Sequence, residues 1–251
     1  MEPKSQKCPE GLLTTHDYWA NKRFRGFRKF RKQCTKPLVR LGCKVIPAVY
    51  KLWMCFVFAT SKVEQRGGLD IPATVEANPK MVVALWHQDV FSAPHLFKCL
   101  GVHTLANTSD LGHLITAVLE KHQFKVFRGG RKRCIILRDM IRYMTEQERV
   151  VYGLTVDGSR GPARKMKRGA CTIARECQVP IFLVSSQARY QLRCATWDRL
   201  LVFLPFNRIE TRMIGPFMID TDCSEEAFAE RCNELEARLN QLEDEVKASV
   251  G

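Results

Sequence analysis

The sequence predicts an α/β fold with a central, mostly parallel sheet flanked by helices. Two observations support this: short apolar runs recur along the chain, and amphipathic stretches of about ten to fifteen residues separate them. The 251 residues, 45% of them hydrophobic, suit one large globular domain with an N-terminal attachment. The expected divisions are a flexible N-terminus at 1–21, a basic and amphipathic membrane-association segment at 22–62, an α/β domain at 63–222 and a C-terminal helix at 223–251.

The N-terminal region is strongly basic. Residues 21–36 carry eight basic residues and no acid, interleaved with Phe24, Phe27 and Phe30. The whole chain has 40 Lys and Arg against 26 Asp and Glu, a net charge of +14. Such a surplus favours a polyanionic partner, and a basic-aromatic segment suits either nucleic acid or anionic lipid. A solvated basic arm is the third possibility.

Residues 37–60 predict a wide apolar helix with a basic stripe. Pro37 can open the helix, and Arg40, Lys44 and Lys51 fall within about 40° of one another at 100° per residue. This pattern is typical of a helix lying in the membrane interface. Its longest uncharged run is about nine residues, against roughly twenty needed for a span. A core helix covering the sheet is the competing interpretation, whereas nucleic acid gives no reason for so apolar a face.

The following body alternates strand and helix patterns. Strands are expected at 81–86, 102–106, 124–127, 150–156, 179–184, 201–204 and 209–214. Helices are expected at 88–100, 110–122, 131–146, 167–177 and 224–246. Ser224 is the expected N-cap of the last helix, whose apolar residues recur at helical spacing.

His87 stands at the end of the apolar run 81–86, and therefore at the rim of the predicted sheet. A neutral imidazole there can take a proton from an alcohol at physiological pH. A structural, capping histidine is the plainer interpretation.

Two later turns are expected at the same edge, because parallel strands end on one side of a sheet. The first follows the strand at 124–127 and carries Arg128 and Gly129; the second spans 157–162 and carries Arg160. Guanidinium groups offer forked donors to a phosphate, and a glycine-rich turn lets backbone N–H groups approach an anion. His87 would then deprotonate a hydroxyl held beside that phosphate.

The ordered blocks WHQDVFS, FKVFRGG, DGSRGP and VPIFLV resemble the glycerophospholipid and lysophospholipid acyltransferase superfamily, over roughly residues 60–220. The resemblance is to its branch of short bacterial proteins once grouped as a domain of unknown function. It implies that His87 is the general base. It also implies that two further blocks hold the acceptor's phosphate: Arg128 and Gly129 in one, and Asp157, Gly158, Ser159, Arg160 and Gly161 in the other.

The resemblance further implies transfer of an acyl chain from a coenzyme A or acyl carrier protein thioester to a hydroxyl of a (lyso)phospholipid, glycerol phosphate or lipid A-type acceptor. The thioester is a co-substrate, so neither a bound cofactor nor a metal is expected. The expected partners are anionic membrane lipid and the thioester carrier, at the cytoplasmic face of the membrane.

One departure from the family pattern concerns the partner of the base. The family places an acid five residues after the histidine, where this chain has Ser92. A serine accepts a hydrogen bond but does not stabilise imidazolium as a carboxylate does. Ser92 is therefore expected among the substrate-binding residues. Asp89 could act instead if the helix begins after it, or Asp110 could reach across from the next loop. Without either acid, a catalytically weakened lipid-binding or scaffold protein is the alternative, and a nucleic-acid-binding protein is the less favoured one.

The eleven cysteines are scattered and form no CxxC pair, which argues against a zinc ribbon or finger. Their odd number and the polar N-terminus without a secretory signal favour reduced thiols in a cytoplasmic setting.

Overall fold

The fold is taken from a computed structural model, which describes residues 37–129 and 133–251. The predicted flexible stretch 1–21, the basic stretch 22–36 and Gly130 lie outside the described residues. The strands are β1 (Lys62–Glu64), β2 (Lys80–Leu85), β3 (Val102–Asn107), β4 (Lys125–Gly129), β5 (Val150–Thr155), β6 (Ile181–Ala188), β7 (Gln191–Arg193), β8 (Leu201–Phe203) and β9 (Arg208–Phe217). The helices are α3 (Pro37–Thr60), α4 (Ile71–Ala77), the 3-10 turn η1 (His87–Phe91), α5 (Ala93–Leu96), α6 (Asp110–Lys121), α7 (Arg133–Glu146), α8 (Gly169–Cys177) and α9 (Glu225–Val250).

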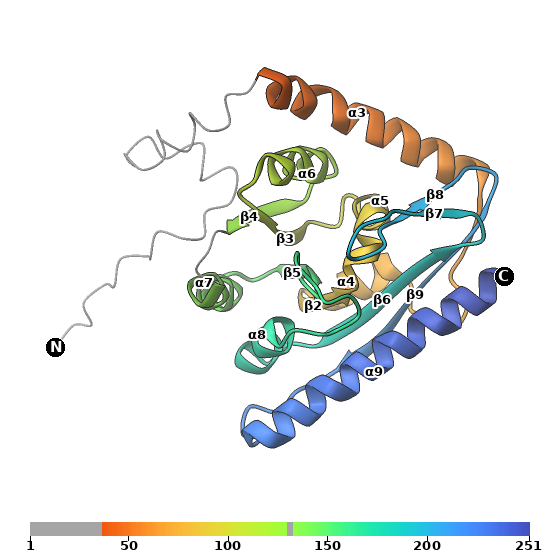
Figure 1. Cartoon of the computed structure of the whole chain (residues 1–251). Helices are drawn as coiled ribbons and strands as arrows, with labels where there is room; N and C mark the ends of the chain where they lie inside the picture. The colour runs from red at the N-terminus through yellow and green to blue at the C-terminus, as the bar shows by residue number, and fades with distance from the viewer. Residues whose placement is uncertain (1–36, 130–132) are drawn as a thin grey trace.

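Seven strands form the central sheet in the order β1-β9-β6-β2-β5-β3-β4 (Figure 1). Neighbouring strands are parallel except for the antiparallel pair β6 and β9. Strands β7 and β8 form a separate antiparallel hairpin. The predicted α/β class with a mostly parallel sheet is therefore confirmed.

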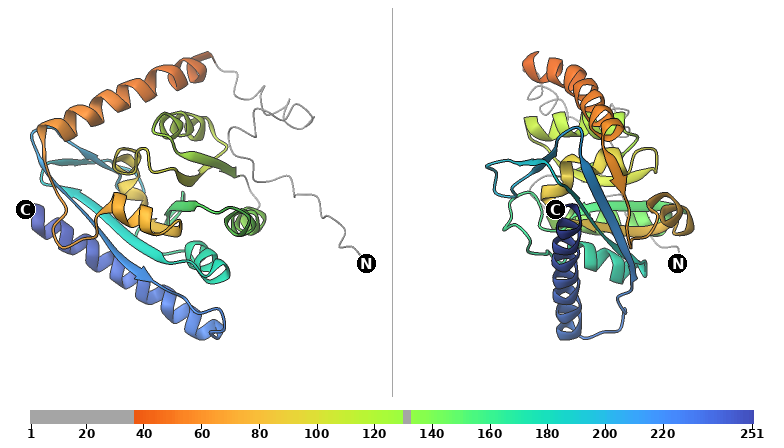
Figure 2. Two further views of the ribbon diagram at one scale, coloured as in Figure 1. Left: turned by 180° about the vertical axis from the view of Figure 1, so that it is seen from behind. Right: turned by 90° about the vertical axis from the view of Figure 1, so that its right-hand side faces the viewer.

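Helices cover both faces of this sheet, so the domain has three layers (Figure 2). One apolar core joins α7, α8 and α9 to one face, and includes the fully buried Trp86 and Tyr152. The other core joins α4 and α6 to the opposite face through residues such as Met81 and Val126. Because β2 is buried on both sides, its sequence is a continuous apolar run rather than an alternating one.

The predicted elements agree with the structure in most places, and three differences have local causes. The expected helix at 88–100 is instead η1 followed by the short α5, because Pro94 has no N–H to donate to the preceding turn. The three-residue strands β1 and β7 are too short to show a periodic pattern. Helix α4, with Asp70 as its N-cap, has only seven residues and was not expected. The predicted N-cap Ser224 is confirmed, since its side chain accepts from the N–H of Ala227 at 3.2 Å.

Helix α3 packs along α6 on the outside of the domain (Figure 1). Its inner face is fixed by Tyr50, Met54 and Val57, which are buried against the body. Val39–Thr60 is long and apolar enough to cross a membrane by length and composition alone.

The outer face of α3 is apolar and exposed. Its side chains, Leu41, Val45, Val49, Leu52 and Phe56, are between 45% and 74% exposed. At 100° per residue they fall within about 80° of arc. We call these five residues the α3 stripe.

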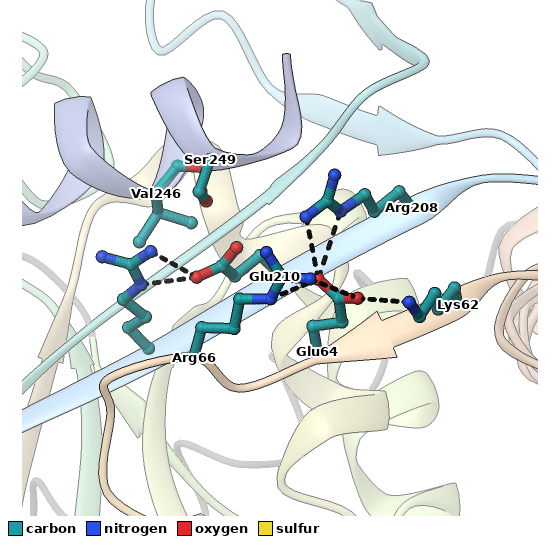
Figure 3. A network of polar contacts seen from close by, with 8 residues as sticks. Lys62, Glu64, Arg66, Arg208, Glu210, Val246 and Ser249 are labelled. Atoms are coloured by element: carbon teal, nitrogen blue, oxygen red, sulfur yellow. Dashed lines mark hydrogen bonds and ion pairs between the residues drawn. The ribbon is translucent and has the colours of Figure 1, made fainter.

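A network of ion pairs holds the edge strand β1 against β9 (Figure 3). The carboxylate of Glu64 contacts Lys62 Nζ at 2.8 Å, Arg66 Nε at 2.9 Å and Arg208 Nη2 at 3.1 Å. The hydrogen bond from Lys62 and those from Arg208 lower the pKa of Glu64 to about 2, despite opposing burial.

Because of this low pKa, the contribution of Glu64 to the free energy of unfolding depends on pH in the acidic range. Above its ordinary pKa of 4.5 the ionised Glu64 stabilises the fold, and that contribution is lost as the pH falls from 4.5 towards 2. We expect Glu64→Gln to reduce the loss of stability over this window, measured by urea unfolding at a series of pH values. The exposed Glu148→Gln is the control, and equal pH slopes for Glu64→Gln and wild type would contradict the assignment.

Candidate active site

His87 is the first residue of η1, directly after β2, at the carboxyl edge of the parallel strands. Its backbone N–H donates to Asp157 Oδ1 at 2.9 Å. Asp157 follows β5, the neighbour of β2, so this bond fixes the start of η1 to the adjacent loop. The second oxygen of Asp157 accepts from the N–H of Arg164 at 3.4 Å. Burial raises the pKa of Asp157, while the hydrogen bond from His87 opposes that rise.

The imidazole of His87 contacts a carboxylate from a distant part of the chain. Its Nδ1 lies 2.6 Å from Oδ2 of Asp198, in the loop between β7 and β8. The His87 side chain is 23% exposed and the Asp198 side chain 5%. Burial opposes ionisation of Asp198, but hydrogen bonds from Thr196 and His87 outweigh it, so its pKa is lowered. The pair is therefore an imidazole with an ionised carboxylate behind it.

The β7–β8 hairpin reaches the site through two neighbouring residues, Trp197 and Asp198. The ring of Trp197 lies 5.1 Å from that of His87, and the two planes are tilted by 53°. Trp197 also packs against Gly161, where an added Cβ would come within 2.6 Å of the indole. Strand β8 also packs against η1. The hairpin thus connects His87 with the turn after β5.

The conformation of the turn at 157–161 depends on two glycines with positive φ and on hydrogen bonds from Lys167. Gly158 and Gly161 have φ of +69° and +66°, a region that favours glycine. Lys167 Nζ donates to the carbonyl oxygens of Asp157 and Gly161, the latter at 2.9 Å. Ser159 and Arg160, between the glycines, are exposed. A basic, glycine-rich turn therefore lies beside the imidazole, as the sequence predicts.

The close approach at Gly161 gives a stability prediction. We expect Gly161→Ala to destabilise the protein by about 1–2 kcal/mol, because alanine is strained at this φ and its Cβ meets Trp197. In a thermal melt this is a fall in Tm of roughly 2–8 °C. The matched control is Gly169→Ala, where nothing lies within 4 Å of the added Cβ. A Gly161→Ala protein as stable as Gly169→Ala would contradict the packing described.

Asp89 and Ser92, the two polar residues proposed from the WHQDVFS block, are buried: Asp89 lies within η1 and Ser92 is its C-cap. Asp89 is 3% exposed, and its pKa is raised by burial and by the nearby Glu243. In the described part of the chain it makes no hydrogen bond to the His87 ring. The Ser92 hydroxyl donates to the Asp89 carbonyl at 3.0 Å and so helps to close the 3-10 turn. The predicted roles of Asp89 in orienting the base and of Ser92 in binding substrate stay predictions.

Arg128 and Gly129 are the last residues of β4, at the expected edge of the sheet. Arg128 contacts α6 and Gly129 contacts α7. Strand β4 lies three strands from β2, roughly 14 Å at the usual strand spacing. Arg128 is 8% exposed and donates from Nη1 to Thr116 Oγ1 at 2.7 Å and to the Gly112 carbonyl at 3.3 Å, both on α6. Gly129 is covered by Ile136. Their predicted contact with an acceptor's phosphate stays a prediction.

Asp110, the other acid proposed for His87, is the first residue of α6. Ser109 caps this helix, and the carboxylate of Asp110 lies near His113. Burial lowers the pKa of His113, and the charge of Asp110 only partly opposes that shift. The contact that the His87 ring does make is to Asp198.

Sequence reasoning missed Asp198. The available signal was weak: a Trp-Asp pair in a polar stretch between the strand patterns at 179–184 and 201–204. The contact joins residues 111 positions apart, and no spacing rule connects them.

The domain is a three-layer α/β fold with a His–Asp pair at the carboxyl edge of its parallel strands, the edge at which α/β proteins commonly bind ligands. No protein-family model matches the chain. The uncharacterized protein RP090 of Rickettsia prowazekii (strain Madrid E) is 23% identical over 145 residues, covering 57% of this chain and 66% of that relative. Just under two thirds of the relative's own length is therefore matched. Among solved structures, the 1-acyl-sn-glycerophosphate (LPA) acyltransferase PlsC from Thermotoga maritima is similar, with a TM-score of 0.47 and 21% identity over 78% of this chain and 77% of that chain.

Proposed function

We propose that this protein is a membrane-associated O-acyltransferase with His87 as its general base. The observation that carries the proposal is the His87–Asp198 contact of 2.6 Å at the sheet edge, beside the glycine-rich turn that carries Arg160. The order of sequence blocks around His87, Arg128 and 157–161, which resembles the glycerolipid acyltransferases, supports the same reaction.

In the proposed reaction, His87 Nε2 takes the proton from an acceptor hydroxyl. The hydroxyl oxygen attacks the carbonyl carbon of an acyl thioester, so a C–O bond forms and the C–S bond breaks. The thiolate of coenzyme A or acyl carrier protein leaves and receives the proton from His87. Backbone N–H groups at 159–161 are suited to stabilise the oxyanion, whereas that of Gly158 already donates to the Thr155 carbonyl at 3.3 Å. This route needs no covalent enzyme intermediate.

The exposed Arg160 is the residue we propose for the acceptor's phosphate. A guanidinium group makes paired hydrogen bonds to phosphate oxygens, and residues 158–161 place it on the same turn that contacts the histidine loop through Asp157. Arg128 differs, because its guanidinium group is buried and bonded to α6. The acceptor class we propose is therefore a phosphate-bearing lipid hydroxyl such as a lysophospholipid, glycerol phosphate or lipid A precursor.

We further propose that the protein binds the cytoplasmic face of the membrane through the α3 stripe. The stripe is exposed, while the opposite side of α3 is fixed against the body, which favours a helix lying on the membrane over one crossing it. Arg40, Lys44 and Lys51 are exposed along the same helix and can contact anionic headgroups.

An acyl-transfer panel tests the proposal. Purified protein is incubated with acyl-coenzyme A or acyl carrier protein donors and with lysophosphatidic acid, glycerol 3-phosphate or a lipid A precursor in anionic vesicles. The expected result is a new acyl ester on one class of acceptor. Vesicle binding without product from any donor–acceptor pair supports the lipid-binding alternative, and salt-sensitive oligonucleotide binding without vesicle binding supports the nucleic-acid alternative.

A further inference from the structure

The His87–Asp198 contact also identifies the residue that takes the place of the family's missing acid. We infer that Asp198, delivered by the β7–β8 hairpin, is the positioning residue of the active site, which fixes the ring orientation and tautomer of His87. This inference rests on the proposed acyl transfer and goes beyond it, because neither the sequence blocks nor the comparisons assign a role to residues 191–203.

The hydrogen-bonding chemistry of the pair determines the tautomer. An ionised carboxylate is an acceptor only, so the atom facing Asp198 Oδ2 at 2.6 Å must be a protonated Nδ1. The pKa of Asp198 is lowered, which keeps it ionised at neutral pH. The lone pair of neutral His87 is then on Nε2, the nitrogen that has to accept a proton from the hydroxyl. When Nε2 takes that proton, the carboxylate stabilises the imidazolium formed.

The surroundings of Asp198 suit a fixed partner rather than a mobile surface charge. Its side chain is 5% exposed, and Thr196 holds it from within the same loop. The neighbouring Trp197, although 40% exposed, contacts both the His87 ring and Gly161, and β8 packs on η1. The candidate acids nearer in sequence differ: Asp89 has a raised pKa from burial, and Asp110 lies at the start of α6.

The test compares Asp198→Asn and Asp198→Glu with wild type in the full-length chain. For Asp198→Asn we expect kcat to fall by about 10³-fold, with KM changed by less than about threefold, because the residue acts through His87 and does not bind substrate. Asp198→Glu should recover part of that kcat. The matched control is Asp222→Asn, an exposed acid in the loop after β9, which should keep wild-type kcat.

A measurement independent of turnover separates this inference from the proposed function. Long-range ¹H–¹⁵N spectra of ¹⁵N-histidine-labelled protein, with His87 assigned from His87→Ala, report which ring nitrogen carries the proton. We expect Nδ1–H in wild type and a loss of that preference in Asp198→Asn, with Tm within a few degrees. An unchanged tautomer, or wild-type kcat in Asp198→Asn, overturns the inference.

The inference is also overturned if Asp198→Asn lowers both Tm and kcat strongly and Asp198→Glu restores neither. Asp198 would then only anchor the hairpin structurally. If wild type transfers no acyl group but shows the expected tautomer change, the proposed function fails while the positioning of His87 by Asp198 stands.

Discussion

His87→Ala is expected to lower the rate of acyl transfer by about 10³-fold, since general-base catalysis contributes 10²–10⁴-fold and the substitution removes the proposed base. The substitution removes the ring while leaving the backbone N–H that donates to Asp157. The loop should therefore keep its shape, and the loss should appear in kcat rather than in KM. Initial rates at saturating donor and acceptor measure this.

His103→Ala is not a suitable control, because His103 is buried in the core and burial lowers its pKa to about 4. The better control is Gly169→Ala, which adds a methyl group where nothing lies within 4 Å. His87→Ala with wild-type kcat would show that some other group removes the proton. The general-base role proposed for His87 would then be wrong.

Replacing Val49 and Leu52 with serine is expected to weaken binding to anionic vesicles by roughly 100-fold. These two members of the α3 stripe are 60% and 74% exposed. Fully burying a side chain of this kind contributes about 1.5–3 kcal/mol, and partial insertion of two of them corresponds to this factor. Since both side chains point away from the core, Tm should change little. Vesicle co-sedimentation at several salt concentrations measures the binding.

The control for the stripe is the double variant Leu69→Ser, Met218→Ser. Both residues are exposed apolar side chains outside α3, at 37% and 46%. This variant should bind vesicles as wild type does. The same loss in both double variants would mean that general surface hydrophobicity, and not the α3 stripe, determines binding.

Phe206 is 73% exposed, and its ring lies 5.9 Å from that of Phe56 in the α3 stripe. On the proposed membrane binding, Phe206 would extend the apolar surface beyond the helix.

The sequence predicted most of the fold because its buried strands and long amphipathic helices have strong patterns. The run at 81–86 and the helix at 37–60 were located within about one residue of β2 and α3. The elements it missed, such as β7 and α4, are too short for a period to appear. Pro94, by contrast, was a readable signal against the continuous helix expected at 88–100.

For the site, the sequence predicts which loops lie at the same sheet edge, but it does not predict contacts between residues far apart in the chain. His87 and the turn at 157–161 were expected at one sheet edge, and the hydrogen bond from His87 N–H to Asp157 joins them there. Parallel topology also placed Arg128 at that edge, but the direction of its side chain depends on α6, through Thr116. The carboxylate behind His87 comes from a hairpin outside the main sheet, which strand order alone does not position.

The central claim is that His87 activates a hydroxyl for attack on a thioester, and the ratio of the two products tests it most directly. Thiol released from the donor is measured with a thiol reagent, and the acyl ester gained by the acceptor lipid is measured by mass spectrometry in the same reaction. We expect one ester for each thiol in wild type, and a parallel loss of both in His87→Ala. Thiol release with free fatty acid and no acceptor ester would contradict it, because the activated nucleophile would then be water.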